Sequence, residues 1–310
     1  MQYGVMASGQ MPDALPDPGV FREIATTAEG LGYTSLWCGD HLSFGNPILE
    51  GSVALASLSA YTNSITIGTG VLLLALRSAG LVAKQIASID YLSGGRVICG
   101  VGVGGDSDKD FDLVGVPMNE RGARTEEGIR VLKVLWRDDP ASFEGRFNEF
   151  SDVGLNPMPV TPGGPPVWVG GRAPAALSRV GRLADGWMGY MVTPRRYAAG
   201  LADIRLAAEG AGRRADEIIP ALMIPTRIGP DGDAAREQLR AHLSRRYHSE
   251  FDIGFIEKAC LAGDPDEIRA RVGVYREAGV RHLIFLYGGN PIDAADQFAM
   301  LHDSVVEGSE

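Results

Sequence analysis

The chain has few cysteines, no long apolar run and no excess of positive charge. Its three cysteines, Cys38, Cys99 and Cys260, are odd in number and widely spaced, which fits neither a disulfide framework nor a zinc motif and predicts a reducing cytoplasm. No apolar run reaches about 18 residues and no signal-peptide pattern opens the sequence, so we expect no membrane span. The net charge of −10 argues against nucleic acid or an anionic membrane as the main partner.

The sequence also lacks the common hydrolase and metal motifs. It contains no H-E-x-x-H, C-x-x-C or G-x-S-x-G pattern, and its five histidines do not have metal-ligand spacing. We therefore expect no metal site and no serine-hydrolase chemistry. What is present is a chain of 310 residues with 45% hydrophobic and 22% charged residues, which predicts an ordered protein with a sizeable core.

Short apolar runs alternate with amphipathic stretches along the chain. The runs predict strands at residues 2–7, 35–38, 65–74, 97–103, 167–169, 186–188, 218–228 and 281–287. Helical patterns follow them at residues 18–30, 53–61, 79–92, 119–136 (with Asn119 as the N-cap), 174–183, 194–211, 234–246 and 293–306. This alternation favours an α/β fold, a closed (β/α)8 TIM barrel, over a doubly wound sheet, with residues 1–310 forming a single domain.

One segment interrupts the alternation. Residues 139–166 are rich in proline and glycine and carry a hairpin signal around residues 143–147. We interpret this segment as an insertion lying over the barrel, and expect it to form the substrate side of the mouth together with the loop 42–50. Phe44, Phe143 and Phe147 are candidates for lining that mouth.

The predicted strand 35–38 ends in Gly39-Asp40-His41. Because the C-terminal ends of barrel strands carry the chemistry of TIM-barrel enzymes, His41 is a candidate proton donor and acceptor, and Asp40 is its neighbour. Elsewhere in a sequence, such a pair would more often be structural.

Glycines end three of the other strands. Gly100-Val-Gly102-Val-Gly104-Gly105 matches G-x-G-x-x-G, but no helix opens at its last glycine, so a dinucleotide-binding fold is disfavoured. We expect a backbone that a flat ring can approach closely, with a simple turn as the alternative. Gly68 and Gly70 indicate a bulge or a similar close approach in the preceding strand.

Two predicted helix starts combine backbone N–H groups with basic side chains. Gly170-Gly171-Arg172 precedes one helix, and Thr193-Pro194-Arg195-Arg196 opens the next. Both suit an anion such as a phosphate. A plain turn and an ordinary proline-containing cap are the alternatives.

Taken in order, these motifs resemble the bacterial luciferase-like monooxygenase superfamily, most closely its coenzyme F420-dependent oxidoreductases. The resemblance extends over nearly the whole chain. It rests on Ala28-Glu-Gly-Leu-Gly-Tyr33, Trp37-Cys-Gly-Asp40-His41, Gly68-Thr-Gly70-Val71, Ala83-Lys-Gln85, Leu92-Ser-Gly-Gly-Arg96, Gly100-Val-Gly102, Asn119-Glu-Arg121, Trp168-Val-Gly-Gly171, Ala184-Asp-Gly-Trp187, Gly263-Asp-Pro-Asp-Glu267 and Ala278-Gly-Val280.

The resemblance implies a barrel that holds F420 at its C-terminal mouth and transfers a hydride at C5 of the deazaflavin. It gives His41 the acid/base role and Asp40 a tuning or orienting role toward the ring or the imidazole. It also implies a non-prolyl cis peptide at Gly70-Val71 behind the ring. The remaining implied contacts are Asp108 to the ring, Gly170, Gly171 and Arg172 to the tail, and Thr193 with Arg195 or Arg196 to its phosphate.

Several expectations stay open at this point. An Asp-His pair favours F420, whereas FMN-dependent members tend to have Glu-His; the alternative is an FMN-dependent two-component monooxygenase using FMNH2 and O2. A non-catalytic cofactor carrier is a third possibility. The sugar-phosphate dehydrogenase branch has Glu and Asn where this chain has Gly105 and Asp108, so we do not expect glucose-6-phosphate chemistry, and the ring contact at Asp108 is in question. The expected partners are a small organic substrate, a second copy of the chain in a homodimer, and a flavin or F420 reductase.

Overall fold

Parallel strands form a closed ring at the centre of the protein. The structure is a computed structural model that describes residues 1–7 and 17–306. Within these residues the eight barrel strands are β1 (Gln2–Met6), β2 (Ser35–Cys38), β3 (Thr66–Thr69), β5 (Val97–Gly102), β8 (Val167–Gly170), β9 (Gly186–Tyr190), β10 (Ile219–Ile228) and β12 (His282–Tyr287). Neighbours pair in the order β10-β12-β1-β2-β3-β5-β8-β9, and the pairing of β10 with β9 closes the ring. The predicted TIM barrel is confirmed.

Two short strands extend this sheet. Strand β4 (Leu72–Leu73) follows β3 and pairs with β5, and β11 (Leu261–Gly263) pairs with the far end of β10. The predicted strand 65–74 is therefore interrupted at Gly70 and Val71, where the backbone leaves the ladder.

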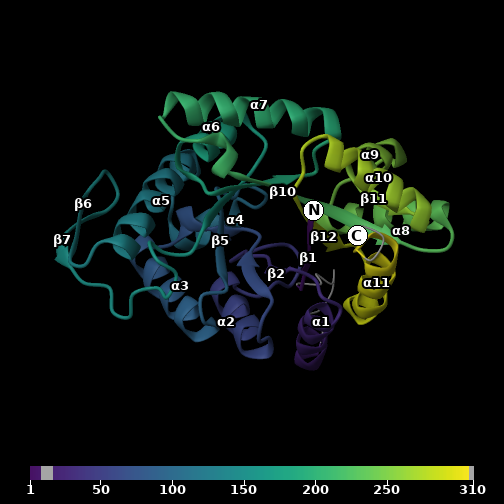
Figure 1. Cartoon of the computed structure of the whole chain (residues 1–310), viewed down its shortest axis with the longest axis horizontal. Helices are drawn as coiled ribbons and strands as arrows, with labels where there is room; N and C mark the ends of the chain where they lie inside the picture. The colour runs from purple at the N-terminus through teal and green to yellow at the C-terminus, as the bar shows by residue number, and fades with distance from the viewer. Residues whose placement is uncertain (8–16, 307–310) are drawn as a thin grey trace.

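Helices cover the outside of the barrel (Figure 1). The α-helices are α1 (Pro18–Gly30), α2 (Gly51–Tyr61), α3 (Ala79–Ser93), α4 (Lys109–Val114), α5 (Arg121–Arg137), α6 (Pro174–Leu183), α7 (Pro194–Gly210), α8 (Gly232–Tyr247), α9 (Ile253–Ala259), α10 (Pro265–Glu277) and α11 (Ala294–Leu301). Short turns are η1 (Leu74–Leu76), η2 (Met118–Glu120), η3 (Ala215–Glu217), η4 (Pro291–Asp293) and the π-helical η5 (His302–Val306). Over the described ranges, none of the helices combines the length and the apolar character needed to cross a membrane.

Local capping explains several of these helix boundaries. Asp17 precedes Pro18 and accepts a hydrogen bond from the Gly19 N–H, which fixes the start of α1 where the sequence predicts it. The predicted N-cap at Asn119 is wrong, because Asn119 lies within η2 and α5 begins at Arg121. Helices α4, α9 and α10 and strand β11 are additional to the predicted elements.

Two of the apolar clusters in the described residues build the barrel. One lies between the strands and the helices and includes Leu36, Ile67, Val101 and Phe285. The other fills the inside of the barrel and contains Met6, Trp37, Trp168, Met188, Ala221, Met223, Ile284 and Leu286. The three cysteines are buried, and burial raises the pKa of the Cys99 and Cys260 thiols to about 12, as suits side chains that fill the core.

A polar network lies among the apolar side chains inside the barrel. The imidazole of His282 bonds through Nε2 to the Ser35 hydroxyl at 2.7 Å and through Nδ1 to Oε1 of Gln2 at 3.0 Å. The Trp37 indole donates to the same hydroxyl at 2.7 Å. Burial lowers the pKa of His282 to about 4, so the native ring is neutral near neutral pH.

The predicted hairpin forms, but away from the barrel mouth. Strands β6 (Ala141–Glu144) and β7 (Glu149–Val153) pair antiparallel and lie at the edge of the molecule beyond α5 (Figure 1). The buried carboxylate of Glu127 on α5 accepts the backbone N–H groups of residues 146, 147 and 148, which fixes the hairpin turn to that helix. Phe143 stacks on Phe150, and Phe147 lies between two arginines, so neither phenylalanine lines the mouth as we expected.

The buried histidine predicts a pH-dependent stability. In the unfolded chain His282 titrates near its ordinary pKa of 6.5, whereas the native ring has a pKa of about 4, so the unfolded state binds more protons between these values. The free energy of unfolding therefore falls as the pH drops through this window. The test is to measure the free energy of unfolding by urea at about pH 7 and about pH 4.5, in the parental chain and in His282→Gln. We expect the decrease between the two pH values to be about 2 kcal/mol smaller in the variant, because it lacks the imidazole that takes up the proton on unfolding.

The design of this comparison isolates one side chain. His242, whose pKa burial also lowers to about 4, is present in both chains, and its contribution cancels in the difference. Equal losses of stability in the two chains over this pH range would contradict the assignment of a neutral buried His282.

Candidate active site

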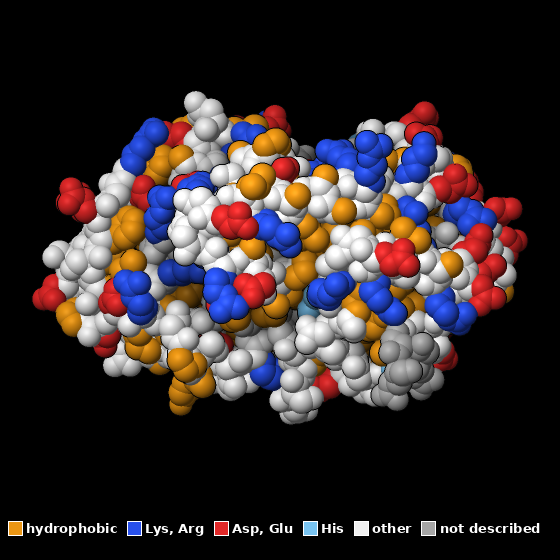
Figure 2. All heavy atoms as spheres, turned by 45° about the horizontal axis from the view of Figure 1, so that its top comes forward, with side chains coloured by type: hydrophobic (Ala, Val, Ile, Leu, Met, Phe, Trp, Pro, Cys, Tyr) orange, Lys and Arg blue, Asp and Glu red, His pale blue; other side chains and the backbone are white. Residues whose placement is uncertain are grey.

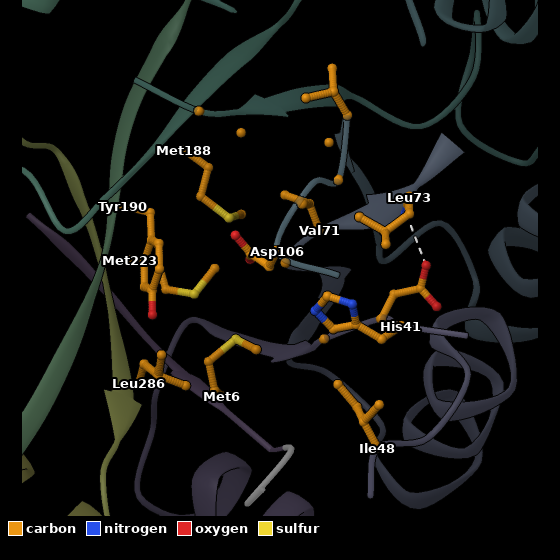
Figure 3. Close-up of a pocket in the computed structure, with 18 of the residues that line it drawn as sticks. Met6, His41, Ile48, Val71, Leu73, Asp106, Met188, Tyr190, Met223 and Leu286 are labelled. Carbon is orange, nitrogen blue, oxygen red and sulfur yellow. Dashed lines mark hydrogen bonds between the residues drawn. The ribbon is translucent and has the colours of Figure 1, made fainter. Parts of the chain in front are cut away.

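The C-terminal ends of the barrel strands surround one cavity of about 260 Å³. Figure 3 shows Met6, Met188 and Met223, from β1, β9 and β10, gathered on one side and the His41 imidazole facing them from the other. The cavity wall is completed by Gly39, Asp40, Ile48, Gly70, Val71, Leu73, Gly102, Val103, Gly104, Asp106, Gly170, Gly171, Arg172, Tyr190, Arg246, Tyr247 and Leu286. The site is thus mostly apolar, with a few charged groups at defined places.

The interruption of the third strand presents Val71 to this cavity. The Gly70–Val71 peptide bond is cis, as the family resemblance implied. A Cβ on Gly170 would lie 2.9 Å from Cγ1 of Val71, and one on Gly102 would collide with Cγ2 of the same side chain. Glycines on β5 and β8 therefore make room for the Val71 side chain. The predicted approach of a flat ring to these glycines stays a prediction.

His41 is held by a buried carboxylate that the sequence analysis did not single out. Its Nδ1 lies 2.7 Å from Oδ2 of Asp110 on α4, and the Asp110 side chain is fully buried. Oδ1 of Asp110 accepts the backbone N–H groups of Leu42 and Ser43, both at 2.7 Å. Since carboxylate oxygens accept hydrogen bonds, this geometry suits the His41 tautomer that carries its proton on Nδ1 and donates it to Asp110.

This arrangement leaves Nε2 of His41 for chemistry. Nε2 has no hydrogen-bond partner among the described residues and faces the cavity (Figure 3). The ring of Phe44 stacks on the imidazole with a centroid distance of 4.2 Å, which restrains its rotation. His41 can therefore accept or donate a proton at one defined point of the cavity wall.

Asp40 contacts a different set of groups. Its Oδ1 accepts from the Gly51 N–H at 2.9 Å and from Arg77 at 2.7 Å, and its Oδ2 accepts from the Leu73 N–H at 2.9 Å (dashed line in Figure 3). Asp40 thus joins the end of β2 to the start of α2 and to β4. The side chain that orients the His41 imidazole is therefore Asp110 and not Asp40.

The predicted anion-binding residues fall into two groups. Gly170, Gly171 and Arg172 line the cavity, and the exposed Arg172 donates to the carbonyl oxygens of Tyr190 and Met191. Thr193, Arg195 and Arg196 lie at the start of α7 and do not contribute to the cavity wall. There the Thr193 hydroxyl accepts the Arg196 N–H at 3.4 Å as a helix cap.

The acidic run after β5 is arranged differently from our expectation. Asp108 is exposed at the start of α4 and does not reach the cavity, whereas Asp106 lines it and Asp110 binds His41. The cluster of aspartates in the sequence was a usable signal, but it did not indicate which member is buried. The cavity residues Tyr190, Arg246 and Tyr247 were also missed, because they lie at a strand end and on a helix that carry no motif.

Comparisons with known proteins show the family to which the chain belongs. The model of the luciferase-like monooxygenase family matches residues 1–282. The chain is 30% identical over 294 residues to the F420-dependent glucose-6-phosphate dehydrogenase of Mycobacterium avium, which covers 85% of this chain and 86% of that protein.

Two solved structures share the fold over nearly the whole chain. An F420-dependent secondary alcohol dehydrogenase, in complex with an F420-acetone adduct, has a TM-score of 0.86 at 21% identity and covers 100% of this chain and 99% of its own. The FMN-bound oxygenating constituent of 3,6-diketocamphane monooxygenase from Pseudomonas putida has a TM-score of 0.79 at 16% identity, covering 99% of this chain and 98% of its own. Since the family model covers most of the chain and the barrel is that of these structures, the protein belongs to the luciferase-like monooxygenase family.

Proposed function

We propose that this protein is a coenzyme F420-dependent oxidoreductase that transfers a hydride between C5 of the deazaflavin and a small organic substrate. The observation that carries the proposal is the pairing of His41 with the buried Asp110 at the edge of an apolar cavity. This pairing supplies a proton carrier next to a surface suited to a flat ring. The relatives named for F420-dependent activity at 28–30% identity support the choice of cofactor.

The cavity residues fit a deazaflavin. The Val71 side chain stands on one side, and the thioethers of Met6, Met188 and Met223 offer an adaptable apolar surface. Gly170 and Gly171 leave their backbone open toward the cavity, where we place the start of the cofactor tail. We assign Arg172 to the tail as well, and Thr193 with Arg195 or Arg196 to its phosphate. These last residues can be reached only by a tail that extends beyond the cavity.

The protein's contribution to the reaction follows from these positions. The bound deazaflavin supplies two-electron chemistry as a hydride donor or acceptor at C5. When an alcohol is oxidised, His41 takes the hydroxyl proton at Nε2 while the carbon-bound hydrogen leaves as hydride. Asp110 stabilises the imidazolium that results, and the apolar walls exclude water from it. Asp40 holds the wall around the ring through Gly51, Leu73 and Arg77.

A second candidate, an FMN-dependent monooxygenase using FMNH2 and O2, rests on the similarity to the FMN-bound structure. The Asp40-His41 pair favours F420 over it. The family resemblance further supports a homodimer and a separate flavin or F420 reductase as partners.

Cofactor choice is tested first by binding. We expect the purified full chain to bind F420 with micromolar or tighter affinity in an anaerobic fluorescence titration, and FMN at least about tenfold more weakly, about 1.4 kcal/mol in binding free energy. Preferential binding of FMN would replace the proposal by the monooxygenase. Binding of neither would remove the basis for both.

The acid/base role of His41 is tested by His41→Ala. We expect turnover with a hydride donor found by screening alcohols to fall about 100-fold or more, because a positioned proton carrier contributes at least that much. The affinity for F420, measured by the same titration, is expected to change by less than about threefold. A non-catalytic carrier would show F420 binding without turnover in the parental chain.

Asp110→Asn tests how the imidazole is held. An amide at this position removes the charge that stabilises the imidazolium and can force the proton from Nδ1 to Nε2, so we expect a loss of kcat of about 100-fold with F420 binding retained. The acidic limb of the pH–rate profile for alcohol oxidation, where the base becomes protonated, should also move to lower pH. Asp112→Asn, an exposed aspartate on the same helix, is the matched control. An unchanged pH profile in Asp110→Asn would show that Asp110 is structural only.

A further inference from the structure

Arg246, near the end of α8, is a cation of the cavity wall that the proposed function does not use. Two cations line the cavity, Arg172 and Arg246. Arg172 is exposed and donates to two backbone carbonyls, whereas no salt bridge joins Arg246 to a carboxylate within the described residues. Its Nε is buried without a hydrogen-bond partner in this part of the chain. A guanidinium is always charged. One that is bonded to a neutral tyrosine hydroxyl but to no carboxylate is a costly arrangement in an apolar wall, and an anion would relieve it.

A pair of tyrosines stands next to this guanidinium. The hydroxyls of Tyr190 and Tyr247 lie 2.6 Å apart, and the Arg246 guanidinium carbon is 5.4 Å from the centre of the Tyr247 ring. Burial raises the pKa of Tyr190 well above its ordinary value, so its hydroxyl keeps its proton. Two hydroxyls share one hydrogen bond between them, which leaves one O–H available to donate to a ligand.

A hydrogen bond ties the backbone at Arg246 to a neighbouring loop. The Asn46 amide donates to the Arg246 carbonyl oxygen at 3.1 Å and joins the loop after β2 to the end of α8. Tyr190 packs against the apolar cluster of Met6, Met188, Met223 and Leu286, beside which it stands in Figure 3. The cavity thus has a polar end, formed by the guanidinium and the tyrosine hydroxyls, next to an apolar wall.

We propose that Arg246 and the Tyr190–Tyr247 hydroxyl pair bind the carboxylate of the substrate, which is an organic monocarboxylic acid with an apolar body. This inference rests on the proposed function, since it names the substrate class of that site. One guanidinium matches one carboxylate charge. A phosphate monoester would bring a second negative charge toward Asp106, the cavity carboxylate whose charge acts on Arg246.

The test uses hexanoate, hexanamide and hexyl phosphate as probes of the full-length chain, with and without F420, by isothermal titration calorimetry. We expect hexanoate to bind at least tenfold more tightly than either hexanamide or hexyl phosphate. Arg246→Gln should weaken hexanoate binding tenfold or more, and Arg246→Lys should weaken it less. Asp106→Asn, which removes the nearby negative charge, should strengthen it several-fold.

Arg245→Gln is the matched control, because Arg245 is the exposed neighbour on the same helix and its loss changes the net charge equally. Its hexanoate affinity should stay within about twofold of the parental value. Equal affinities in the parental chain and Arg246→Gln, no binding to the parental chain, or preference for hexyl phosphate would each overturn the inference.

The F420 titration of the same variants separates the two proposals. If F420 binds all of them while hexanoate binding is absent or independent of Arg246, the carboxylate site is wrong and the oxidoreductase proposal stands. If hexanoate binds through Arg246 and F420 does not bind the parental chain, the oxidoreductase proposal fails while the anion site remains. A loss of F420 rather than hexanoate binding in Arg246→Gln would assign the guanidinium to the cofactor and overturn the inference.

Discussion

The pairing of β10 with β9 is the constraint on which the site depends. This pairing closes a ring of parallel strands, so the C-terminal ends of all the barrel strands lie around the same mouth. His41, Val71 and Tyr190 are far apart in the sequence and belong to the ends of different strands. They face one cavity only because the ring is complete. The helices and the hairpin pack outside this ring, and the acidic and basic side chains are interspersed on the surface that Figure 2 presents.

Within the mouth, carboxylates fix backbone as well as side chains. Asp110 binds His41 and the two N–H groups that follow it, so the orientation of the imidazole and the course of the loop are set together. Asp40 does the same for the start of α2 and for β4. The cost of burying each of these two carboxylates is therefore offset by several hydrogen bonds.

The fold could be predicted from the sequence because its signals are local and repeated. Apolar runs of strand length alternate with amphipathic helices, and α1 and α6 begin and end where their prolines and periodic patterns place them. The resemblance located the cis peptide and the strand-end glycines. What failed depended on tertiary partners: the sequence places Asp40 beside His41, but the two side chains leave the chain in different directions, and the partner of His41 comes from a helix 69 residues later.

Other residues could not be placed because their surroundings come from distant elements. Phe143 and Phe147 are aromatic residues in a turn, and nothing local distinguishes packing on α5 from lining the mouth. Arg246 is one of several arginines on α8, and only the tertiary structure shows that it faces the cavity while Arg245 faces solvent. Asp108 and Asp110 are likewise separated only by the burial of one side of the short helix α4.

The three thioethers on one side of the cavity have a consequence for how the substrate specificity of such an enzyme evolves. Met6, Met188 and Met223 come from three different strands and belong to the cluster inside the barrel, which is separate from the layer that packs strands against helices. Each is unbranched and adapts its shape to a neighbour. A single substitution at one of these positions can change the shape of the cavity while the layer between strands and helices stays intact. A new substrate specificity can therefore arise from one amino-acid change.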